Sequence, residues 1–262
     1  MSRPDPYARA REALIVALDV PSFEDARRVI DQLEEDVRIF KVGSQLFTAC
    51  GPVVVRYLLA RGKQVFLDLK FHDIPNTVAG AVRAAVGLGE PGHQQMDERQ
   101  NAVEFTQKGL FMCTLHTLGG EEMLRRAVEA ATQEARRLGV RRPLLVGITV
   151  LTSQKAGDNI PQLVLQRALL ARRAGLDGVV ASTGEAAMLR RELGEDFVVV
   201  TPGIRPRGAA LGDQKRVSTP RDALREGSRF LVVGRPILQA ADPSRAARDV
   251  LAEMQEVFED SR

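Results

Sequence analysis

Eight short, continuously apolar runs recur along the chain, and this repetition is the strongest constraint on its fold. Strands of a parallel sheet that is covered on both faces read as unbroken apolar runs. Amphipathic stretches separate the runs, as expected for helices that cover such a sheet. The expected strands span residues 13–18, 37–40, 65–67, 110–115, 144–151, 178–181, 197–200 and 230–233. The main expected helices span residues 23–33, 77–86, 121–138, 160–174, 184–193 and 220–226.

A polar, small or charged residue follows each apolar run. These residues are Asp19, Lys41, Asp68, His116, Thr152, Ser182, Thr201 and the pair Gly234 and Arg235. In an α/β barrel the carboxyl ends of all the strands meet at one face, where the active site of this fold lies. A doubly wound open sheet would bind ligands only at a switch point between strands. Because all eight ends are marked, we predict a closed (β/α)8 TIM barrel.

The length of the chain agrees with this prediction. A chain of 262 residues is typical of one eight-stranded α/β barrel. No long linker or shift in composition marks a second domain, so we predict a single domain over residues 1–262. Residues 90–109 form the longest connection. We expect a surface excursion there, partly helical over 96–107, on the face opposite the active site and without a catalytic role.

Two carboxylates and an ammonium, Asp68, Lys70 and Asp73, lie within six residues at the third strand end. Side chains two apart on an extended strand share a face, so Asp68 and Lys70 are expected to meet. Lys41 and Asp19 are expected to face the same cavity from two other strand ends. Crowded charges are costly to bury unless the cluster has a function. Opposite charges would keep one another ionised, so we predict a charge-based active site.

A second polar site is predicted where the seventh and eighth strands end. A long loop rich in Gly and Pro follows the seventh strand and contains Arg205 and Gln214, and Gly234 and Arg235 end the eighth strand. Barrels of this fold often hold a phosphate at this place. Gly234 would permit close approach, and Arg235 would supply a forked donor. We therefore expect a phosphorylated substrate.

Composition excludes several other classes of protein. The net charge is +3, from 37 basic and 34 acidic residues, and only 5% of residues are aromatic, so no nucleic-acid partner is expected. Cys50 and Cys113 lie among apolar neighbours, which predicts buried free thiols. No signal-peptide core or membrane-length apolar run occurs. We therefore expect a cytoplasmic enzyme without a membrane partner.

One motif is highly specific: residues 67–77 read Leu-Asp-Leu-Lys-Phe-His-Asp-Ile-Pro-Asn-Thr. Weaker motifs accompany it in a fixed order at residues 14–19, 40–43, 116–120, 151–153, 201–205 and 233–235. Together they make the chain resemble the bacterial-type orotidine 5′-phosphate decarboxylase family over nearly its whole length. The excursion at 90–101 is longer than this family usually carries there.

The resemblance implies decarboxylation of orotidine 5′-monophosphate to uridine 5′-monophosphate, the last step of de novo UMP synthesis, with no metal or organic cofactor. It implies that Lys70 is the proton donor, that Asp68 lies beside the substrate carboxylate, and that Lys41 and Asp73 complete the charge array. Asp73 and Thr77 would reach the neighbouring subunit's site, so a homodimer is implied. The resemblance also implies that Asp19 and Lys41 contact the ribose, that Thr152 contacts the pyrimidine, and that the phosphate and loop contacts are Arg205, Gln214, Gly234 and Arg235. The other implied substrate contacts are Leu69, Phe71, His72, Ile74, Pro75 and Asn76.

Two other functions stay open. A metal-dependent keto-sugar phosphate decarboxylase or aldolase shares the D-x-K-x-x-D pattern, but would need a metal-binding carboxylate, such as a Glu, where this chain has Asp19 and Lys41. Activity that survives a chelator would separate the two enzymes. A non-catalytic barrel that binds a phosphorylated ligand would gain little from so many desolvated charges.

Overall fold

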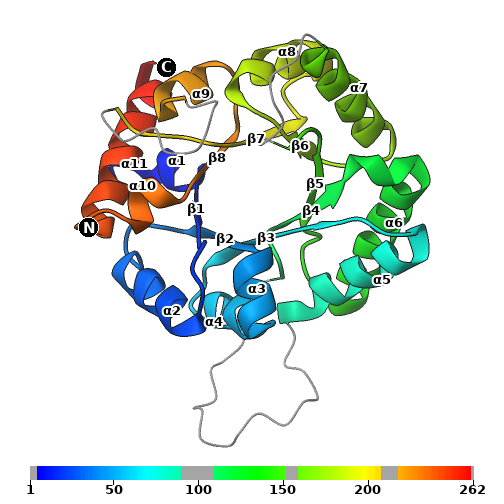
Figure 1. Cartoon of the computed structure of the whole chain (residues 1–262), viewed down its shortest axis with the longest axis horizontal. Coiled ribbons are helices and arrows are strands. Elements are labelled where there is room, and N and C mark those ends of the chain that lie inside the picture. Colours follow the sequence, from blue (N-terminus) through cyan, green and yellow to red (C-terminus); the bar gives the residue numbers. More distant parts are fainter. Residues whose placement is uncertain (1–4, 90–108, 152–158, 208–217, 261–262) are drawn as a thin grey trace, which may run out of the picture.

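The computed structural model describes residues 5–89, 109–151, 159–207 and 218–260. Eight parallel strands form a closed barrel in chain order, and β8 pairs back onto β1. Figure 1 looks down this barrel, with the helices arranged around it. The predicted (β/α)8 barrel is therefore confirmed. The strands are β1 Leu14–Ala17, β2 Ile39–Gly43, β3 Gln64–Phe71, β4 Met112–His116, β5 Leu144–Ile148, β6 Gly178–Val180, β7 Val198–Pro202 and β8 Phe230–Val233.

All six predicted helices are present, with small changes at their ends. Helix α5 begins at Pro75 and not at the predicted Thr77, because proline suits the first turn of a helix. The helices are α1 Ala8–Arg11, α2 Phe23–Gln32, α3 Ser44–Cys50, α4 Val53–Ala60, α5 Pro75–Val86, α6 Gly120–Leu138, α7 Ile160–Arg173, α8 Thr183–Leu193, α9 Pro220–Arg225, α10 Arg235–Leu238 and α11 Pro243–Asp260, with 3₁₀ turns η1 Gly87–Gly89 and η2 Thr117–Gly119.

Local capping explains where several helices start. The Ser22 hydroxyl accepts a hydrogen bond from the backbone N–H of Asp25, and Thr219 caps α9 in the same way. Ser182 forms a capping box with Glu185 at the start of α8. The polar residue after the sixth strand therefore serves its helix, although the strand-end pattern pointed it toward the active site.

The apolar side chains form two layers. An inner cluster fills the barrel and includes Ile15, Phe66, Met112 and Val200. A larger outer cluster lies between the strands and the helices. Because the interior is packed in this way, the barrel is a solid core and not an open channel.

Strands β2, β3, β4 and β7 extend further than the apolar runs indicated, and the extensions of β2 and β3 carry charged residues. Strand β2 continues to Gly43 and β3 continues to Phe71, and Gly43 pairs with Asp68. Lys41, Asp68 and Lys70 therefore lie within strands and not after them. The backbone ladder can continue past the apolar run because these polar side chains face a cavity.

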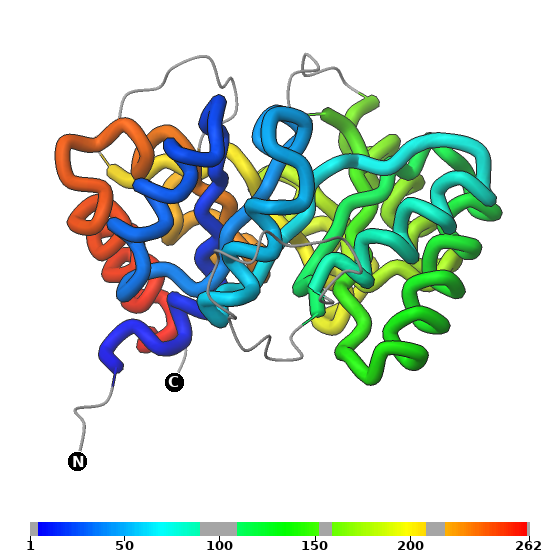
Figure 2. Tube along the Cα trace, turned by 90° about the horizontal axis from the view of Figure 1, so that it is seen from below, coloured from blue at the N-terminus to red at the C-terminus, as the bar shows by residue number. Residues whose placement is uncertain are grey.

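The two ends of the described chain meet at one side of the barrel. Arg9 of α1 donates a hydrogen bond to the carbonyl of Phe258 in α11. Figures 1 and 2 both show α1 (blue) beside α11 (red).

Three further predictions concern single segments. Cys50 and Cys113 are free thiols as predicted, but Cys50 is only partly buried. No helix in the described ranges is long and apolar enough to cross a membrane. The excursion predicted for residues 90–109 lies, except for Gly109, outside the described residues.

Candidate active site

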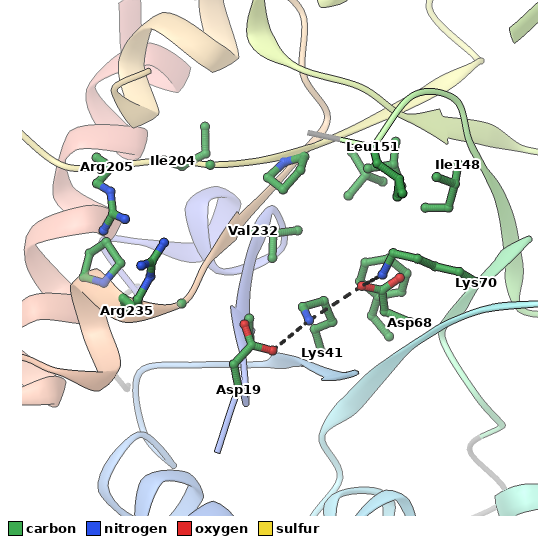
Figure 3. Close-up of a pocket in the computed structure, with 18 of the residues that line it drawn as sticks. Asp19, Lys41, Asp68, Lys70, Ile148, Leu151, Ile204, Arg205, Val232 and Arg235 are labelled. Atoms are coloured by element: carbon green, nitrogen blue, oxygen red, sulfur yellow. Dashed lines mark hydrogen bonds and ion pairs between the residues drawn. The ribbon is translucent and has the colours of Figure 1, made fainter. Parts of the chain in front are cut away.

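A cavity of about 460 Å³ opens at the carboxyl ends of the strands. This is the face on which the active site was predicted, and the volume suits a small organic ligand. The cavity is lined by Ala17, Asp19, Lys41, Phe66, Asp68, Lys70, Ile148, Val150, Leu151, Val180, Val200, Pro202, Gly203, Ile204, Arg205, Val232, Gly234, Arg235, Pro236 and Gln239. Two arginines lie at one end and Lys70 lies at the other, with apolar side chains such as Val232 between them (Figure 3).

Four charges of alternating sign form a row that runs from Asp19, below Arg235, to Lys70 at the opposite end of the cavity (Figure 3). Lys41 Nζ lies 3.1 Å from Asp19 Oδ1 and 3.6 Å from Asp68 Oδ2. Lys70 Nζ donates a hydrogen bond of 2.9 Å to the same Asp68 oxygen. The side chains of Lys41 and Asp68 are each only 12% exposed, so their attraction is weakly screened. We call Asp19, Lys41, Asp68 and Lys70 the charge row.

The backbone at Lys70 departs from the extended form that the sequence predicted. Its φ is +51°, and among the described residues it is the only residue other than glycine with a positive φ. Such a conformation is unusual for a side chain of this size and persists only where its surroundings impose it. Asp68 and Lys70 do meet as predicted, but not by simple alternation along a strand.

Gly43 leaves the space that the Lys41 ammonium occupies. A Cβ atom at this position would lie 3.1 Å from Lys41 Nζ and 3.6 Å from Asp19 Oδ1. Glycine therefore lets the second strand end beside the charge row without displacing it.

Two arginines form the other end of the cavity, away from Lys70 (Figure 3). Arg205 is only 7% exposed, and its Nε has no hydrogen-bond partner among the described residues. The backbone N–H of Arg205 donates a hydrogen bond to the carbonyl of Ser218. Arg235 begins α10 directly after Gly234. We call Arg205 and Arg235 the arginine end. A buried guanidinium with an unused N–H is suited to an anionic ligand.

Seven of the predicted site residues line the cavity. They are Asp19, Lys41, Asp68, Lys70, Arg205, Gly234 and Arg235. Thr152 and Gln214 lie outside the described residues, although Leu151 and Gly203, near them in sequence, line the cavity.

Asp73 was predicted to face the same cavity as the charge row, and this prediction was wrong for its own chain. Its carboxylate is exposed and accepts a hydrogen bond from the N–H of Ile74. The chain turns into α5 directly after β3, and Asp73 is not among the residues that line the cavity. The other predicted residues outside the cavity lining are Leu69, Phe71, His72, Ile74, Pro75, Asn76 and Thr77. Leu69 and Phe71 pack against the outer core instead.

His72 and His116 lie together beside the charge row. Their rings stack at 5.3 Å between centroids, with 25° between the planes. His116 Nδ1 accepts a hydrogen bond from the N–H of Leu118. Burial lowers the pKa of His116 below its usual value of 6.5, and His72, Arg167 and Lys70 lower it further. The imidazole of His116 is therefore held in its neutral form more firmly than a free histidine.

Sequence reasoning missed two parts of the site. The first is the apolar lining, for example Phe66, Ile148 and Val232, because a continuous apolar run does not reveal which residues point inward. The second is Thr114 in β4, whose hydroxyl donates to Asp68 at 3.0 Å and accepts from the N–H of Lys70 at 2.8 Å. The only signal for it was a threonine within an apolar run.

The geometry limits the chemistry. Two ammonium groups share one buried carboxylate at one end, and two guanidinium groups lie at the other, which suits a ligand that carries an anionic group far from its reacting atom. Within the described ranges, no cluster of three or more His, Cys, Asp or Glu residues is arranged to hold a metal ion.

Comparison with known proteins agrees with this arrangement. The model of the orotidine 5′-phosphate decarboxylase / HUMPS family matches residues 12–250. The orotidine 5′-phosphate decarboxylase of Moorella thermoacetica is 45% identical over 257 residues, which cover 95% of this chain and 94% of that protein. The decarboxylase of Geotalea daltonii is 43% identical, over 94% of this chain and 97% of that protein. The crystal structure of orotidine 5′-phosphate decarboxylase from Lactobacillus acidophilus matches with a TM-score of 0.73 and 33% identity, over 93% of this chain and 99% of that one. The chain therefore belongs to the orotidine 5′-phosphate decarboxylase / HUMPS family.

Proposed function

We propose that this protein decarboxylates orotidine 5′-monophosphate to uridine 5′-monophosphate and CO₂ in pyrimidine biosynthesis. The observation that carries the proposal is the pairing of the charge row with the arginine end in one cavity. Relatives with 43–45% identity over nearly their full length carry the name of this enzyme, which supports the same reaction here.

The reaction needs a positive charge at the carbon that loses CO₂. Departure of CO₂ leaves an electron pair at C6 in the plane of the pyrimidine ring, where the π system cannot accept it. Without an electron sink, the developing carbanion must be stabilised electrostatically. The Lys70 ammonium can stabilise this charge and then donate its proton to C6. No metal or organic cofactor takes part in the proposed mechanism.

Asp68 and Lys41 support Lys70 in this mechanism. Asp68 accepts from Lys70 Nζ at 2.9 Å, which orients the ammonium and keeps it protonated. In this proposal the substrate carboxylate leaves from beside Asp68. Lys41 neutralises the second side of Asp68 and, with Asp19, offers hydrogen bonds to the ribose hydroxyls.

The arginine end binds the 5′-phosphate in this proposal. Arg205 and Arg235 each offer forked donors to phosphate oxygens, and Gly234 lets the phosphate approach the backbone. The predicted contacts of Thr152 with the pyrimidine and of Gln214 with the phosphate belong to the same proposal. Binding energy gained at the phosphate, far from C6, can hold the ring against Lys70.

A homodimer with shared sites completes the proposal. Asp73 and Thr77 are exposed at the rim of the barrel, where a second subunit could receive them. Ile74 is 67% exposed and Leu118 is 58% exposed, and apolar side chains this open on the same rim are typical of a surface that a partner covers. The cytoplasmic location expected from the sequence stays a prediction.

The direct test is the loss of the absorbance of orotidine 5′-monophosphate when purified protein is added. We expect complete conversion to uridine 5′-monophosphate, with the same rate after treatment with a chelator. Binding of substrate without conversion would instead indicate a non-catalytic barrel. Loss of activity after chelation would favour the metal-dependent sugar-phosphate lyase.

Shared sites can be tested by mixing two inactive variants, Lys70→Ala and Asp73→Asn. If each site takes Lys70 from one subunit and Asp73 from the other, mixed dimers regain one intact site and measurable activity. Equal inactivity of the mixture and of the separate variants, with subunit exchange verified by mass, would contradict the shared-site proposal.

A further inference from the structure

A threonine that no part of the proposed chemistry uses lies directly beneath the charge row. Thr114 is in the middle of β4, and its side chain is fully buried. Its hydroxyl donates to Asp68 Oδ1 at 3.0 Å and accepts from the Lys70 N–H at 2.8 Å. One buried oxygen therefore contacts both residues that we place at the reacting carbon.

The strand pairing explains why this hydroxyl is needed. Leu67 pairs with Cys113, and the next pair is Phe71 with Leu115. Three residues of β3, 68 to 70, thus stand opposite Thr114 alone. Such an irregularity leaves backbone groups without a ladder partner. The Lys70 N–H is one of these groups, and the Thr114 hydroxyl accepts its hydrogen bond in place of a carbonyl of β4.

The same contact maintains the unusual backbone of Lys70. A φ of +51° is unfavourable for a side chain with a Cβ and needs support from its surroundings. The hydrogen bond from the Lys70 N–H to a fully buried side chain supplies such support. This backbone angle sets the direction in which the Lys70 side chain leaves the strand.

Thr114 also fixes the orientation of the Asp68 carboxylate. Asp68 Oδ1 is engaged by the threonine, so Oδ2 is turned toward Lys70 Nζ and Lys41 Nζ. Without that hydrogen bond, the carboxylate could rotate about χ2 and the shared contact with both ammonium groups would be lost.

We infer that Thr114 is a positioning residue for decarboxylation, whose hydroxyl holds the Lys70 backbone and the Asp68 carboxylate in the geometry that aims the ammonium at C6. The inference rests on the proposed function for its kinetic consequence. It does not require Thr114 to touch the substrate, and Thr114 is absent from the described lining of the cavity.

The test compares side chains that differ in the hydroxyl. Thr114→Val keeps the shape and removes the oxygen, and we expect kcat to fall roughly 10- to 100-fold with KM changed less than about threefold, as for misplacement of a catalytic group. Thr114→Ser keeps the oxygen and should return kcat to within about threefold of the wild type. If Thr114→Val does not fold, Thr114→Ala and Thr114→Ser form a second pair that differs by the oxygen alone.

A matched control removes another buried hydroxyl from a barrel strand. Thr201 in β7 is fully buried, and its hydroxyl bonds to Ser228 at 2.7 Å and not to the charge row. We expect Thr201→Val to leave kcat within about threefold of the wild type, since a surviving fold keeps the charge row intact. Equal losses in Thr114→Val and Thr201→Val, or a Thr114→Ser variant as slow as Thr114→Val, would overturn the inference.

A second readout does not depend on turnover. The crystal structure of Thr114→Val, or of Thr114→Ala, should show a changed φ at Lys70 or a broken contact between Lys70 Nζ and Asp68 Oδ2. An unchanged geometry in that structure would overturn the inference even if the wild type decarboxylates its substrate. Failure of the proposed function would appear separately, as absence of turnover by the wild type.

Discussion

The two ends of the cavity are built differently. The charge row is balanced, since each ammonium contacts a carboxylate within 3.6 Å. The arginine end includes a guanidinium that is 7% exposed and has an Nε without a partner among the described residues. A balanced row is already organised before a ligand arrives, whereas the arginine end gains contacts from an anion. The first arrangement suits chemistry and the second suits binding.

The largest effect is expected at the charge row. Lys70→Ala should lower kcat by about 10⁵-fold, because it removes both the stabilising charge and the proton donor. Affinity for uridine 5′-monophosphate should change less than about tenfold, since the arginine end is intact. Steady-state kinetics and calorimetry check the two values. Near-normal turnover by this variant would show that Lys70 is not the proton donor. The division into a reacting end and a binding end would then be wrong.

The next effect is expected at the arginine end. Arg235→Ala should lower kcat/KM for orotidine 5′-monophosphate by about 10³-fold, through the loss of charge-assisted hydrogen bonds to phosphate. The same variant should process orotidine, which lacks the phosphate, at the slow rate of the wild type. Arg245→Ala, at an exposed position on α11, is the matched control. A parallel loss with both substrates would mean that Arg235 acts at the reacting end as well.

A smaller effect is expected from Gly43→Ala. The new methyl group would lie 3.1 Å from Lys41 Nζ, which must shift by a few tenths of an ångström. We expect kcat/KM to fall about tenfold, with little change in the melting temperature, because the ammonium is the flexible end of its side chain. Gly184→Ala is the control, since no atom of the described residues lies within 4 Å of a Cβ there. Unchanged kinetics would show that a small shift of the Lys41 ammonium does not affect catalysis.

The smallest expected effect is on the free energy of unfolding at acid pH, and it comes from His116 beside the charge row. The folded protein resists protonation of His116, whereas the unfolded chain takes up a proton near pH 6.5. Stability should therefore fall as the pH drops through 6.5, and His116→Gln should lose part of this dependence. Urea unfolding at pH 7.5 and pH 5.5 measures the difference, with His72→Gln for comparison. If wild type and His116→Gln show the same pH dependence of stability, His116 is not the group that causes the loss of stability in acid.

The fold could be predicted from the sequence because each strand of a covered parallel sheet is a continuous apolar run. Eight such runs, separated by helical patterns, leave few alternatives to a barrel. Helices α3 and α4 were not predicted, since two short helices fill a connection that shows no clear single period. The direction of each inner side chain was also unpredictable, because an unbroken apolar run lacks the alternation that separates two faces.

Charged site residues could be predicted from the sequence, whereas contacts that depend on the alignment of two strands could not. Asp68 and Lys70 are conspicuous in the sequence because they interrupt apolar residues. The three-to-one pairing opposite Thr114 depends on how two strands align, and no local pattern encodes it. Asp73 looked like part of the same cluster, but the start of α5 directs it elsewhere.

The closure of the barrel has a consequence for selectivity. Strand β1 pairs with β2 on one side and with β8 on the other, and Asp19 follows it between the Lys41 ammonium and the backbone of Gly234. A sheet with free edges could splay to accommodate longer or shorter ligands, but a closed ring of strands cannot. In the proposed mechanism the distance between Lys70 and the two arginines is therefore fixed. We expect the cavity to select ligands by the distance between their anionic group and their reacting atom.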